Sequence, residues 1–449
     1  MPTPPVVKLK MDGGYGSAEE AMQANAGVKG PMKRARPRVI VLGGGFGGLT
    51  VLKGLSGKEV EVVLVDRSNH HLFQPLLYQV ATAALSTSEI AQPIRSIMRG
   101  ARNVTVRLDE AVGVDLPGRR LLLAAGSALQ YDMLVVATGV DYNYFGHTDW
   151  AAHAPSLKSA GDAIEIRRRL LLAFEEAEKS DDPVRRQQLL TFVLVGGGPT
   201  GVEMAGSIAE LARFALRRDF RHIDPASARV ILVEAGPRVL SAFPERLSAY
   251  ALKVLRRMRV EVRLSTSVES IDANGVGTGN GRIEAGLVIW CAGVRGSSAG
   301  SWLGVPSTRH GTVSVAPDLS IAGHPEVFVV GDLAHVGGQS GGPLPQLATV
   351  AKQQGAFVAR VIDARANGRT PPAKFVFRNP GSLAIIGRSS AVVDLGWLRL
   401  TGFPGWVVWA LAYIFFLIGF RNRTTVFVAW AWEWFTYKRG ARLIVDRAR

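Results

Sequence analysis

Cysteine is almost absent from this sequence of 449 residues, which contains only Cys291. One cysteine forms neither an intrachain disulfide nor a redox-active cysteine pair, so the sequence excludes disulfide reductases and dithiol-dependent sulfide oxidoreductases. The eight histidines are scattered, and the adjacent His70 and His71 would point to opposite sides of an extended segment. We therefore expect no metal site.

Acidic residues are scarce relative to basic ones, with 37 Asp and Glu against 53 Lys and Arg, so the formal net charge is +16. This excess indicates a negatively charged partner, for which nucleic acid, an anionic membrane and acidic cofactors are the alternatives. An apolar segment before a cleavage site is also lacking, so secretion is not expected. Residues 1–36 lack a periodic apolar face and end in Lys33, Arg34 and Arg36, which predicts a disordered basic tail that is solvated or contacts a membrane or nucleic acid.

The uncharged run from Leu400 to Phe420 is too short for a single membrane span once its glycines and proline are considered. Gly402, Pro404 and Gly405 place the expected helix start near Trp406, from which the run reaches only roughly 22 Å of the ~30 Å hydrocarbon core. We predict two short helices lying in one leaflet, or alternatively a buried core or dimer interface. Expected to contact anionic head groups are Arg421, Arg423, Lys438, Arg439 and Arg442, and expected at the interface are Trp406, Trp409, Trp430, Trp432 and Trp434.

A glycine motif follows the first buried strand pattern. The apolar run from Val39 to Leu42 is typical of a strand in a parallel sheet, and Gly43, Gly45 and Gly48 after it match G-x-G-x-x-G. The helix that opens at Gly47 to Leu49 directs its N-terminal N–H groups at a pyrophosphate. Asp66 ends the next strand, where its carboxylate can bind ribose hydroxyls, so this segment predicts a dinucleotide site.

A second glycine motif begins after the strand predicted from Thr191. Gly196, Gly198 and Gly201 repeat the spacing, and Glu234 ends the strand that starts at Arg229. The number of residues from Gly196 to Glu234 is larger than usual for this motif, which is explained by a helix that we expect to extend through Arg217. Glu234 is predicted to bind ribose and to favour NADH over NADPH, because a carboxylate repels a 2′-phosphate, although a solvated strand end is the alternative and Arg238 lies near.

Other segments complete a repeated pattern. Residues 287–294 resemble 134–140, including the turn Ala137-Thr138-Gly139, so we expect an internal repeat. The strand ending at Gly331-Asp332 presents a carboxylate that suits flavin ribityl hydroxyls or only starts a turn. The segment from Asn103 to Leu123 is predicted to form an antiparallel ribbon, and the uncharged stretch from His70 to Ser88 to cover a flat apolar group or to pack in the core.

These segments together resemble the flavoproteins with two dinucleotide-binding domains, and among them the single-subunit type II NADH:quinone oxidoreductases. The matching stretches are GGGFGGL at 43, FQPLLYQVA at 73, GGGPTGVEMAG at 196, FRHIDPASARVILVE at 220, VGDLA at 330 and GFRNRTTVFVAWAWEWFTYKRGARLI at 419. The resemblance implies that FAD binds non-covalently at the first site, with Asp66 on its adenosine ribose, the Val112 backbone near adenine and Asp332 on the ribityl chain. It implies NADH at the second site, with Glu234 on the ribose and Glu203 beside nicotinamide and flavin. Predicted cofactor contacts are Gly43, Gly45, Phe46, Gly47, Gly48, Asp66, Arg67, Val112, Ala137, Thr138, Gly139, Gly331 and Asp332 for FAD, and Gly196, Gly198, Pro199, Thr200, Gly201, Glu234 and Gly293 for NADH.

The family also has a quinone-side motif, A-Q-x-A-x-Q-x-G, which falls on residues 348–355. Thr349 stands where the family usually has glutamine, and Lys352 occupies a variable position. The resemblance implies quinone contacts from Gln346, Lys352 and Gln353, although a helix here also leaves Gln353 a purely packing role. Glu203 and Gln353 are the predicted catalytic residues.

The expected fold is α/β, with two Rossmann-like dinucleotide-binding domains and a C-terminal helical membrane-anchoring region. The predicted parts are the tail 1–36, an FAD domain from 37–157 and 297–385, an NADH domain 158–296, and the membrane region 386–449. The predicted function is two-electron transfer from NADH through FAD to a membrane quinone without proton pumping. We expect a homodimer that lies peripherally on the cytoplasmic face of a bacterial inner membrane, contacts anionic lipid and binds no nucleic acid. The alternatives are a soluble NADH-dependent reductase of a small redox protein and a flavoprotein that binds nucleic acid.

Overall fold

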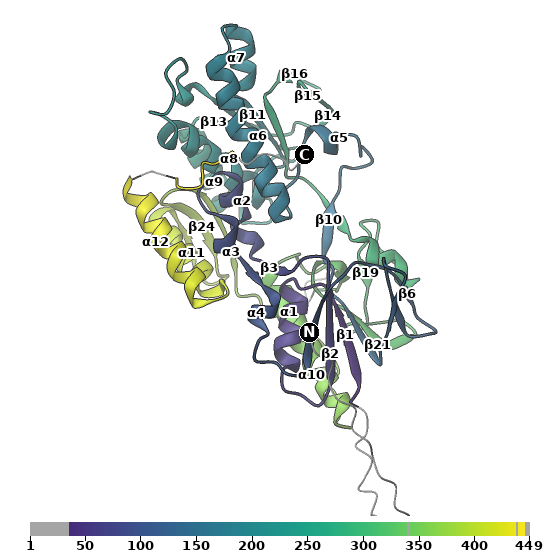
Figure 1. The fold of residues 1–449 in the computed structure, drawn as a ribbon. Helices are drawn as coiled ribbons and strands as arrows, with labels where there is room; N and C mark the ends of the chain where they lie inside the picture. The colour runs from purple at the N-terminus through teal and green to yellow at the C-terminus, as the bar shows by residue number, and fades with distance from the viewer. Residues whose placement is uncertain (1–35, 339–341, 437–438, 445–449) are drawn as a thin grey trace, which may run out of the picture. The chain divides into compact units, whose positions relative to one another are not determined.

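The computed structural model describes residues 36–338, 342–436 and 439–444, and residues 37–449 form one compact unit (Figure 1). The predicted N-terminal tail and Lys438 lie outside the described residues.

The first sheet has six strands in the order β20-β21-β9-β1-β2-β5, and all but β20 run parallel to their neighbours. Its central strand β1 is flanked by β2 and β9, whose buried apolar runs reflect coverage of both faces. Helices α1 and α10 pack together on one face, and the meander β6-β7-β8 covers the other. The bounds are β1 Arg38–Leu42, α1 Phe46–Leu55, β2 Glu61–Asp66, β5 Val104–Leu108, β6 Ala111–Asp115, β7 Arg120–Leu123, β8 Ala128–Gln130, β9 Met133–Val136, β20 Ser320–Ile321, β21 His324–Val329 and α10 Ala348–Ala366.

The ribbon predicted from Asn103 to Leu123 is wrong at its start. Residues Val104–Leu108 form β5, which pairs in parallel with β2, and the antiparallel meander begins only at Ala111. Alternation along β5 misled the prediction, because this strand lies at the sheet edge and is only partly buried.

The second sheet has four parallel strands in the order β13-β12-β11-β17. Helices α6, α8 and α9 contribute to the core on one face, and the small antiparallel sheet β14-β15-β16 lies on the other together with Trp150. Helix α8 continues directly into the π-helical turn η3, which ends at Ala215, so the predicted extension of the helix is present but stops two residues before Arg217. The bounds are α5 Trp150–His153, α6 Ala160–Lys179, α7 Pro183–Leu189, β11 Thr191–Val195, α8 Pro199–Glu210, η3 Leu211–Ala215, η4 Pro225–Ser227, β12 Arg229–Val233, α9 Glu245–Arg257, β13 Val260–Arg263, β14 Val268–Asp272, β15 Gly275–Thr278, β16 Gly281–Glu284 and β17 Leu287–Trp290.

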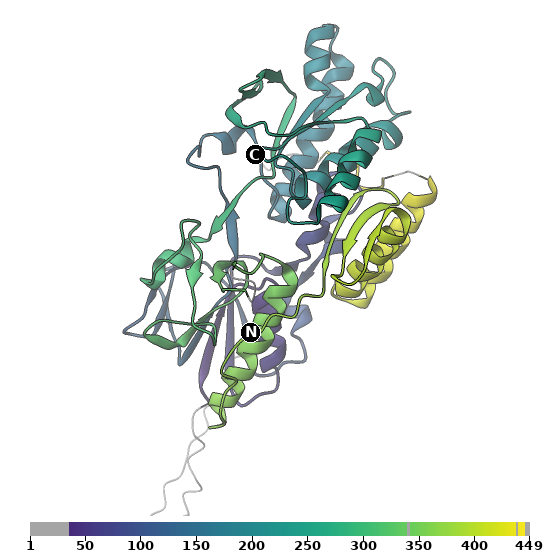
Figure 2. The same cartoon turned by 180° about the vertical axis from the view of Figure 1, so that it is seen from behind.

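Two antiparallel strands, β10 Val140–Tyr142 and β18 Val294–Gly296, carry the chain from one sheet to the other and back. Figure 2 shows the two sheets on either side of this connection. The remaining short elements near the first sheet are η5 Ser298–Leu303, β19 Val313–Ser314, η6 Gly331–Leu333 and β22 Ala334–His335.

The uncharged stretch that starts at His70 packs in the core. Leu76, Leu77 and Val80 are buried beside α6 and α8, which explains the lack of charge without a flat ligand. Its elements are β3 His70–Leu72, η2 Gln74–Leu76, α2 Leu77–Ala81 and α3 Thr87–Ile90, followed by β4 Ala91–Pro93 and α4 Ile94–Ile97.

The C-terminal region begins with a three-stranded antiparallel sheet, followed by two helices that lie side by side (Figure 1). The strands are β23 Ser382–Gly387, β24 Ser390–Asp394 and β25 Arg399–Thr401, and the helices are α11 Gly402–Phe416 and α12 Phe420–Thr436. The predicted helix start at Trp406 is wrong, because Pro404 is tolerated in the first turn, where its missing N–H has no helical partner. Within the described part of the chain, no helix combines the length and the hydropathy that a membrane span needs.

Candidate active site

The first glycine loop follows β1 and leaves one face of its backbone open. A Cβ on Gly43, which has a φ of +100°, would lie 2.5 Å from the Ala137 carbonyl oxygen, so only glycine fits beside β9. A Cβ on Gly48 would lie 1.9 Å from the Gly43 oxygen, because α1 packs closely on the strand. At Gly45 nothing lies within 4 Å, so a phosphate can approach the backbone and the N-terminus of α1.

The second loop repeats this geometry after β11. Gly196 has a φ of +110° and faces the Ala292 backbone, and a Cβ on Gly201 would lie 1.9 Å from the Gly196 oxygen. Gly198 is open in the same way as Gly45. The turns that close each site also correspond, since Gly139 and Gly293 have φ values of +69° and +66°. The two halves are therefore structural repeats.

Each strand-end carboxylate holds its own glycine loop. Asp66 accepts hydrogen bonds from the N–H groups of Gly44, at 2.5 Å, and Ser68, at 2.6 Å. Glu234 accepts from Gly197, at 2.5 Å, and Gly236, at 2.7 Å. The arginine predicted to complicate nucleotide selection, Arg238, donates instead to the Ser241 carbonyl oxygen at 2.9 Å. Both carboxylates keep lone pairs for ribose hydroxyls.

The turn η6 carries Asp332 to the first site. Burial raises the pKa of Asp332, and the nearby Lys158 ammonium opposes this rise. Gln346 donates to the Asp332 carbonyl oxygen at 3.1 Å, and Gln354 accepts from the Gly331 N–H at 2.6 Å. An open glycine loop at a helix N-terminus, Asp66 and Asp332 form a donor and acceptor set that fits the pyrophosphate, ribose and ribityl groups of FAD.

The quinone-side motif lies on α10, beside the first loop and α11. The Lys352 ammonium lies 5.2 Å from the Phe46 ring centroid and 4.6 Å from that of Phe416. Burial and the nearby Lys53 lower the pKa of Lys352 to about 8. The hydroxyl oxygen of Thr349, the residue that departs from the family pattern, is buried without a hydrogen-bond partner, which suits contact with a bound polar group.

Gln353, a predicted catalytic residue and quinone contact, is bound to the backbone of Arg378. Its amide donates to the Arg378 carbonyl oxygen at 2.8 Å and accepts from the Arg378 N–H at 3.0 Å. Both ends of the amide are thus engaged with one backbone residue, and Gln353 does not line the cavity that contains Glu203.

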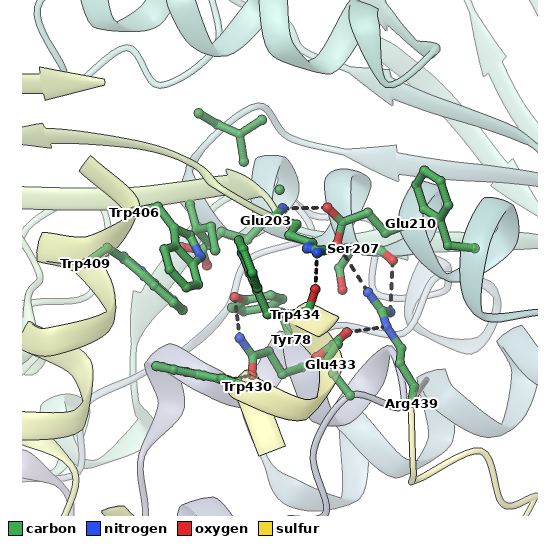
Figure 3. A pocket seen from close by; sticks show the side chains of 17 residues that line it. Tyr78, Glu203, Ser207, Glu210, Trp406, Trp409, Trp430, Glu433, Trp434 and Arg439 are labelled. Atoms are coloured by element: carbon green, nitrogen blue, oxygen red, sulfur yellow. Dashed lines mark hydrogen bonds and ion pairs between the residues drawn. The ribbon is translucent and has the colours of Figure 1, made fainter. Parts of the chain in front are cut away.

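A cavity of about 80 Å³ surrounds Glu203, between α8 and the C-terminal region (Figure 3). Burial raises the pKa of Glu203 to about 8, although its carboxylate accepts a hydrogen bond from the Ile385 N–H. Burial and the charge of Glu203 raise the pKa of Tyr78 and of Tyr413. The cavity therefore holds a carboxyl group that is protonated at neutral pH, next to phenols that stay protonated. Further lining residues are Gln79, Ser207, Glu210, Arg388, Trp406, Trp409, Trp430, Glu433, Trp434 and Arg439.

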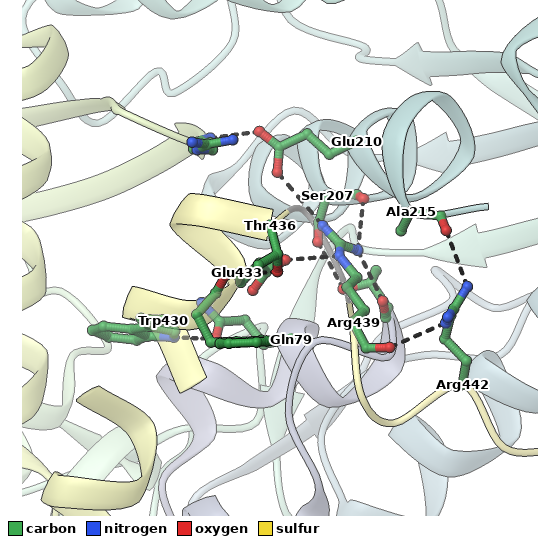
Figure 4. A network of polar contacts seen from close by, with 12 residues as sticks. Gln79, Ser207, Glu210, Ala215, Trp430, Glu433, Thr436, Arg439 and Arg442 are labelled. Carbon is green, nitrogen blue, oxygen red and sulfur yellow. Dashed lines mark hydrogen bonds and ion pairs between the residues drawn. The ribbon is translucent and has the colours of Figure 1, made fainter. Parts of the chain in front are cut away.

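Arg439 lies in the wall of this cavity and contacts several segments of the chain (Figure 4). It is buried, pairs with Glu433 at 2.9 Å and Glu210 at 3.5 Å, and donates to the carbonyl oxygens of Thr82, at 2.8 Å, and Ser207, at 3.0 Å. The prediction that Arg439 contacts lipid head groups is wrong, because its guanidinium instead neutralises two carboxylates within the fold.

Other predicted membrane contacts are also used internally. Arg442 pairs with Asp219 and donates to the Ala215 carbonyl oxygen at 3.0 Å, while Arg423 donates to the carbonyl oxygens of Leu417 and Phe415, both at 2.8 Å. Trp409 and Trp430 belong to the core that includes α8, and Trp409 is 1% exposed. Trp432 is 61% exposed and Arg421 is exposed, as expected for a surface contact.

Comparisons with known proteins match this geometry to one family. A model described as pyridine nucleotide-disulphide oxidoreductase matches residues 37–355, and one described as NDH2 C-terminal domain matches residues 380–438. The chain is 43% identical to the type II NADH:quinone oxidoreductase Ndh of Mycobacterium tuberculosis over 92% of this chain and 91% of the relative. This chain belongs to the type II NADH:quinone oxidoreductases. It is also 40% identical to NdhA of the same organism, with 92% of this chain and 90% of NdhA covered. Among solved structures, NDH2 from Plasmodium falciparum in complex with NADH is similar in fold, with a TM-score of 0.84 at 19% identity, covering 92% of this chain and all of that one.

In this type II NADH:quinone oxidoreductase, most predicted cofactor residues lie at the carboxyl edges of the two sheets. The FAD set follows β1, β2, β9 and β21 directly, except for Val112, which is exposed in β6. The NADH set follows β11, β12 and β17. Lys352 and Gln346 lie by the FAD set, Glu203 lines the cavity, and Gln353 follows Lys352 on α10 with its amide bound to the Arg378 backbone.

Four residues of the enzyme were not predicted from its sequence. Gln354 holds the Asp332 turn, and Lys158 lies close enough to oppose the pKa rise of Asp332. The His71 Nδ1 lies 2.9 Å from the Gly44 carbonyl oxygen, and burial lowers the pKa of His71 to about 4, so the neutral ring donates to the loop. Tyr78 faces Glu203. The sequence carries a signal for Gln354, which lies three positions after Ala351 and therefore on the same, buried face of α10.

Proposed function

We propose that this protein oxidises NADH at the second glycine site and delivers two electrons through FAD, held at the first site, to a membrane quinone. The enzyme is a type II NADH:quinone oxidoreductase, and it carries out this transfer without proton pumping. The observation that carries the proposal is the repeated geometry: two open glycine loops, each held by a strand-end carboxylate, in two sheets of one chain. Bound FAD supplies the redox chemistry that accepts a hydride and releases two electrons.

The residues of the chain bind and orient the reactants. Asp66 would hold the adenosine ribose of FAD and Asp332 its ribityl chain, and Glu234 would hold the ribose of NADH. A 2′-phosphate would approach the Glu234 carboxylate, and Arg238 is engaged with the Ser241 carbonyl oxygen. Discrimination against NADPH follows from this repulsion.

Quinone reduction follows the overall balance NADH + H⁺ + Q → NAD⁺ + QH₂, in which NADH supplies both electrons and one net proton is taken up from solvent. Glu203 is the carboxyl group placed to hold a proton, because its pKa of about 8 keeps it protonated at neutral pH. The cavity beside Glu203 gives its carboxyl space for hydrating water.

The exposed faces of α11 and α12 are the proposed membrane contact. Large apolar side chains protrude there from both helices: Phe403, Leu411, Phe415, Phe420, Phe427, Val428, Trp432 and Phe435. Exposed apolar side chains on two neighbouring helices suit insertion into a membrane surface, and Arg421 adds a charge for anionic lipid. The relatives Ndh and NdhA come from a bacterium, and the proposed location is a bacterial inner membrane. The cytoplasmic face, a homodimer and no nucleic-acid partner are parts of the same proposal.

Stopped-flow absorbance of the purified protein tests the proposed reaction. We expect NADH to bleach the flavin and a quinone to restore its absorbance. A colourless protein, or a yellow one that NADH leaves oxidised, would refute the proposal.

Vesicle co-sedimentation tests the membrane contact. Removal of all residues after about 395 is unsuitable, because it would also delete core residues such as Trp409. The variant with Phe415→Ser, Phe427→Ser and Val428→Ser should stay folded, because all three side chains are exposed, and should lose binding to anionic vesicles. Its rate of reduction of long-chain quinones should fall, while a water-soluble acceptor is still reduced. Val184→Ser, an exposed apolar residue of α7, is the control and should bind like the parent. Unchanged vesicle binding by the triple variant would contradict the proposed contact.

A further inference from the structure

A buried chain of hydrogen bonds runs from α12 to the wall of the Glu203 cavity (Figure 3, Figure 4). The indole N–H of Trp430 donates to Gln79 Oε1 at 2.7 Å, and Gln79 Nε2 donates to the Tyr78 hydroxyl oxygen at 2.8 Å. All three side chains are buried.

The chemistry of the donors fixes the direction of this chain. An indole N–H only donates, so the carbonyl oxygen of the Gln79 amide must face Trp430. The amide nitrogen then faces Tyr78 and uses the phenol oxygen as an acceptor. A phenol that accepts from Gln79 must point its own hydrogen elsewhere.

Tyr78 and Glu203 line the same cavity, on α2 and α8. The charge of Glu203 raises the pKa of Tyr78, so the two groups interact electrostatically. The Glu203 carboxylate is therefore an acceptor within electrostatic reach of the Tyr78 hydroxyl, in the cavity that both residues line.

We propose that Gln79 and Trp430 are positioning residues that turn the Tyr78 hydroxyl hydrogen towards the Glu203 carboxyl. Tyr78 then donates to Glu203 and favours its ionised form once the proton has left. The inference rests on the proposed role of Glu203 as a proton donor, and it links that donor to α12, a helix of the proposed membrane contact.

Several other groups face Glu203 and contribute to its titration in every variant. They come from α8, α11, α12 and the segments after β23 and α12: Glu210, Tyr413, Glu433, Arg388 and Arg439, in addition to Tyr78. A test must therefore change the Tyr78 hydrogen without changing these charges.

Infrared pH titration of the oxidised, purified holoenzyme provides such a test. The carbonyl band of the protonated Glu203 carboxyl is identified by its loss in Glu203→Gln. We expect Tyr78→Phe to move the titration of this band up by on the order of one pH unit, because the ionised carboxylate loses a donor. Trp430→Phe keeps an aromatic ring but frees the Gln79 amide, so it should shift the band upward by a smaller amount.

The double variant separates orientation from packing. We expect Trp430→Phe to add no further shift when Tyr78 is already phenylalanine, since no hydroxyl hydrogen remains to be turned. Trp397→Phe, the same change at an exposed tryptophan, should leave the titration as in the parent. In stopped-flow measurements, the pH limb of flavin reoxidation by quinone should move with the band.

An unchanged titration in Tyr78→Phe overturns the inference, and so does a Trp430→Phe shift that persists in the Tyr78→Phe background. Because the titration is measured without turnover, failure of the proposed function appears separately, as a parent enzyme whose flavin is not reoxidised by quinone.

Discussion

Replacement of Arg439 by methionine should loosen the C-terminal region. The guanidinium is 3% exposed and is shared between Glu210 and Glu433, whose side chains are 19% and 24% exposed. Removing one partner of a buried ion pair costs about 3–5 kcal/mol, and we expect the lower end because both carboxylates retain some contact with solvent. The change also removes one hydrogen-bond donor from each of the carbonyl oxygens of Thr82 and Ser207.

The destabilisation should depend on pH in a defined direction. Burial raises the pKa of Glu210 in the parent, and the Arg439 charge opposes that rise. A carboxyl whose folded pKa is raised favours the folded state while it is protonated, and this contribution is lost as pH rises through the folded value. Without Arg439 the pKa rises further, so the variant should lose more stability at about pH 8 than at about pH 5.

Hydrogen exchange measured by mass spectrometry follows the local opening of α12 and of the end of α8. A loss of about 3 kcal/mol corresponds to roughly a hundredfold faster exchange in these peptides. Arg421→Met, at an exposed arginine of α12, is the matched control and should exchange like the parent. Exchange in Arg439→Met within a factor of about two of the parent, at both pH values, would refute the reasoning.

Three further predictions concern the cofactor sites. Asp66→Ala should lower the ratio of flavin to protein absorbance after gel filtration, because the carboxylate both holds the glycine loop and is placed for ribose, and full flavin content would count against that role. Glu234→Ala should raise the KM for NADH and relax the rejection of NADPH in steady-state kinetics, whereas an unchanged ratio of kcat/KM for the two nucleotides would contradict the assignment. Since the pKa of Glu203 is about 8, its proton is present below that pH and lost above it, so quinone reduction should slow as pH rises through about 8. Glu203→Gln should abolish that limb and slow flavin reoxidation by roughly a hundredfold, and a retained limb would show that another group titrates.

The glycine loops were predictable because their requirements are local. Gly43 and Gly196 need positive φ beside a neighbouring strand, and Gly48 and Gly201 need close packing on the strand just before them, so spacing along the chain is sufficient evidence. The carboxylates at 66 and 234 follow from the same units, since each ends the strand adjacent to its loop.

The membrane region could be predicted only in part because an apolar helix face does not reveal what covers it. Trp430 and Trp432 are two positions apart on α12, so one turns into the core and the other to the surface. Arg439 is of a residue type that is typical of lipid contacts. Only the tertiary fold brings Glu210, which is distant in the sequence, next to it. The family motif indicated Gln353, whereas the structure adds Gln354, which lies on the buried face of α10 and holds the turn that carries Asp332.

Helix α8, Pro199–Glu210, carries three features at different positions. Its N-terminal end faces the glycine loop, Glu203 lies in its middle, and Glu210 at its C-terminal end pairs with Arg439. Each residue added to an α-helix rotates the later residues by about 100° and advances them by about 1.5 Å. A one-residue insertion between 203 and 210 would therefore swing the later contacts away from the earlier ones. Natural and engineered length variation should avoid this segment and collect instead in the irregular stretch at residues 217–224.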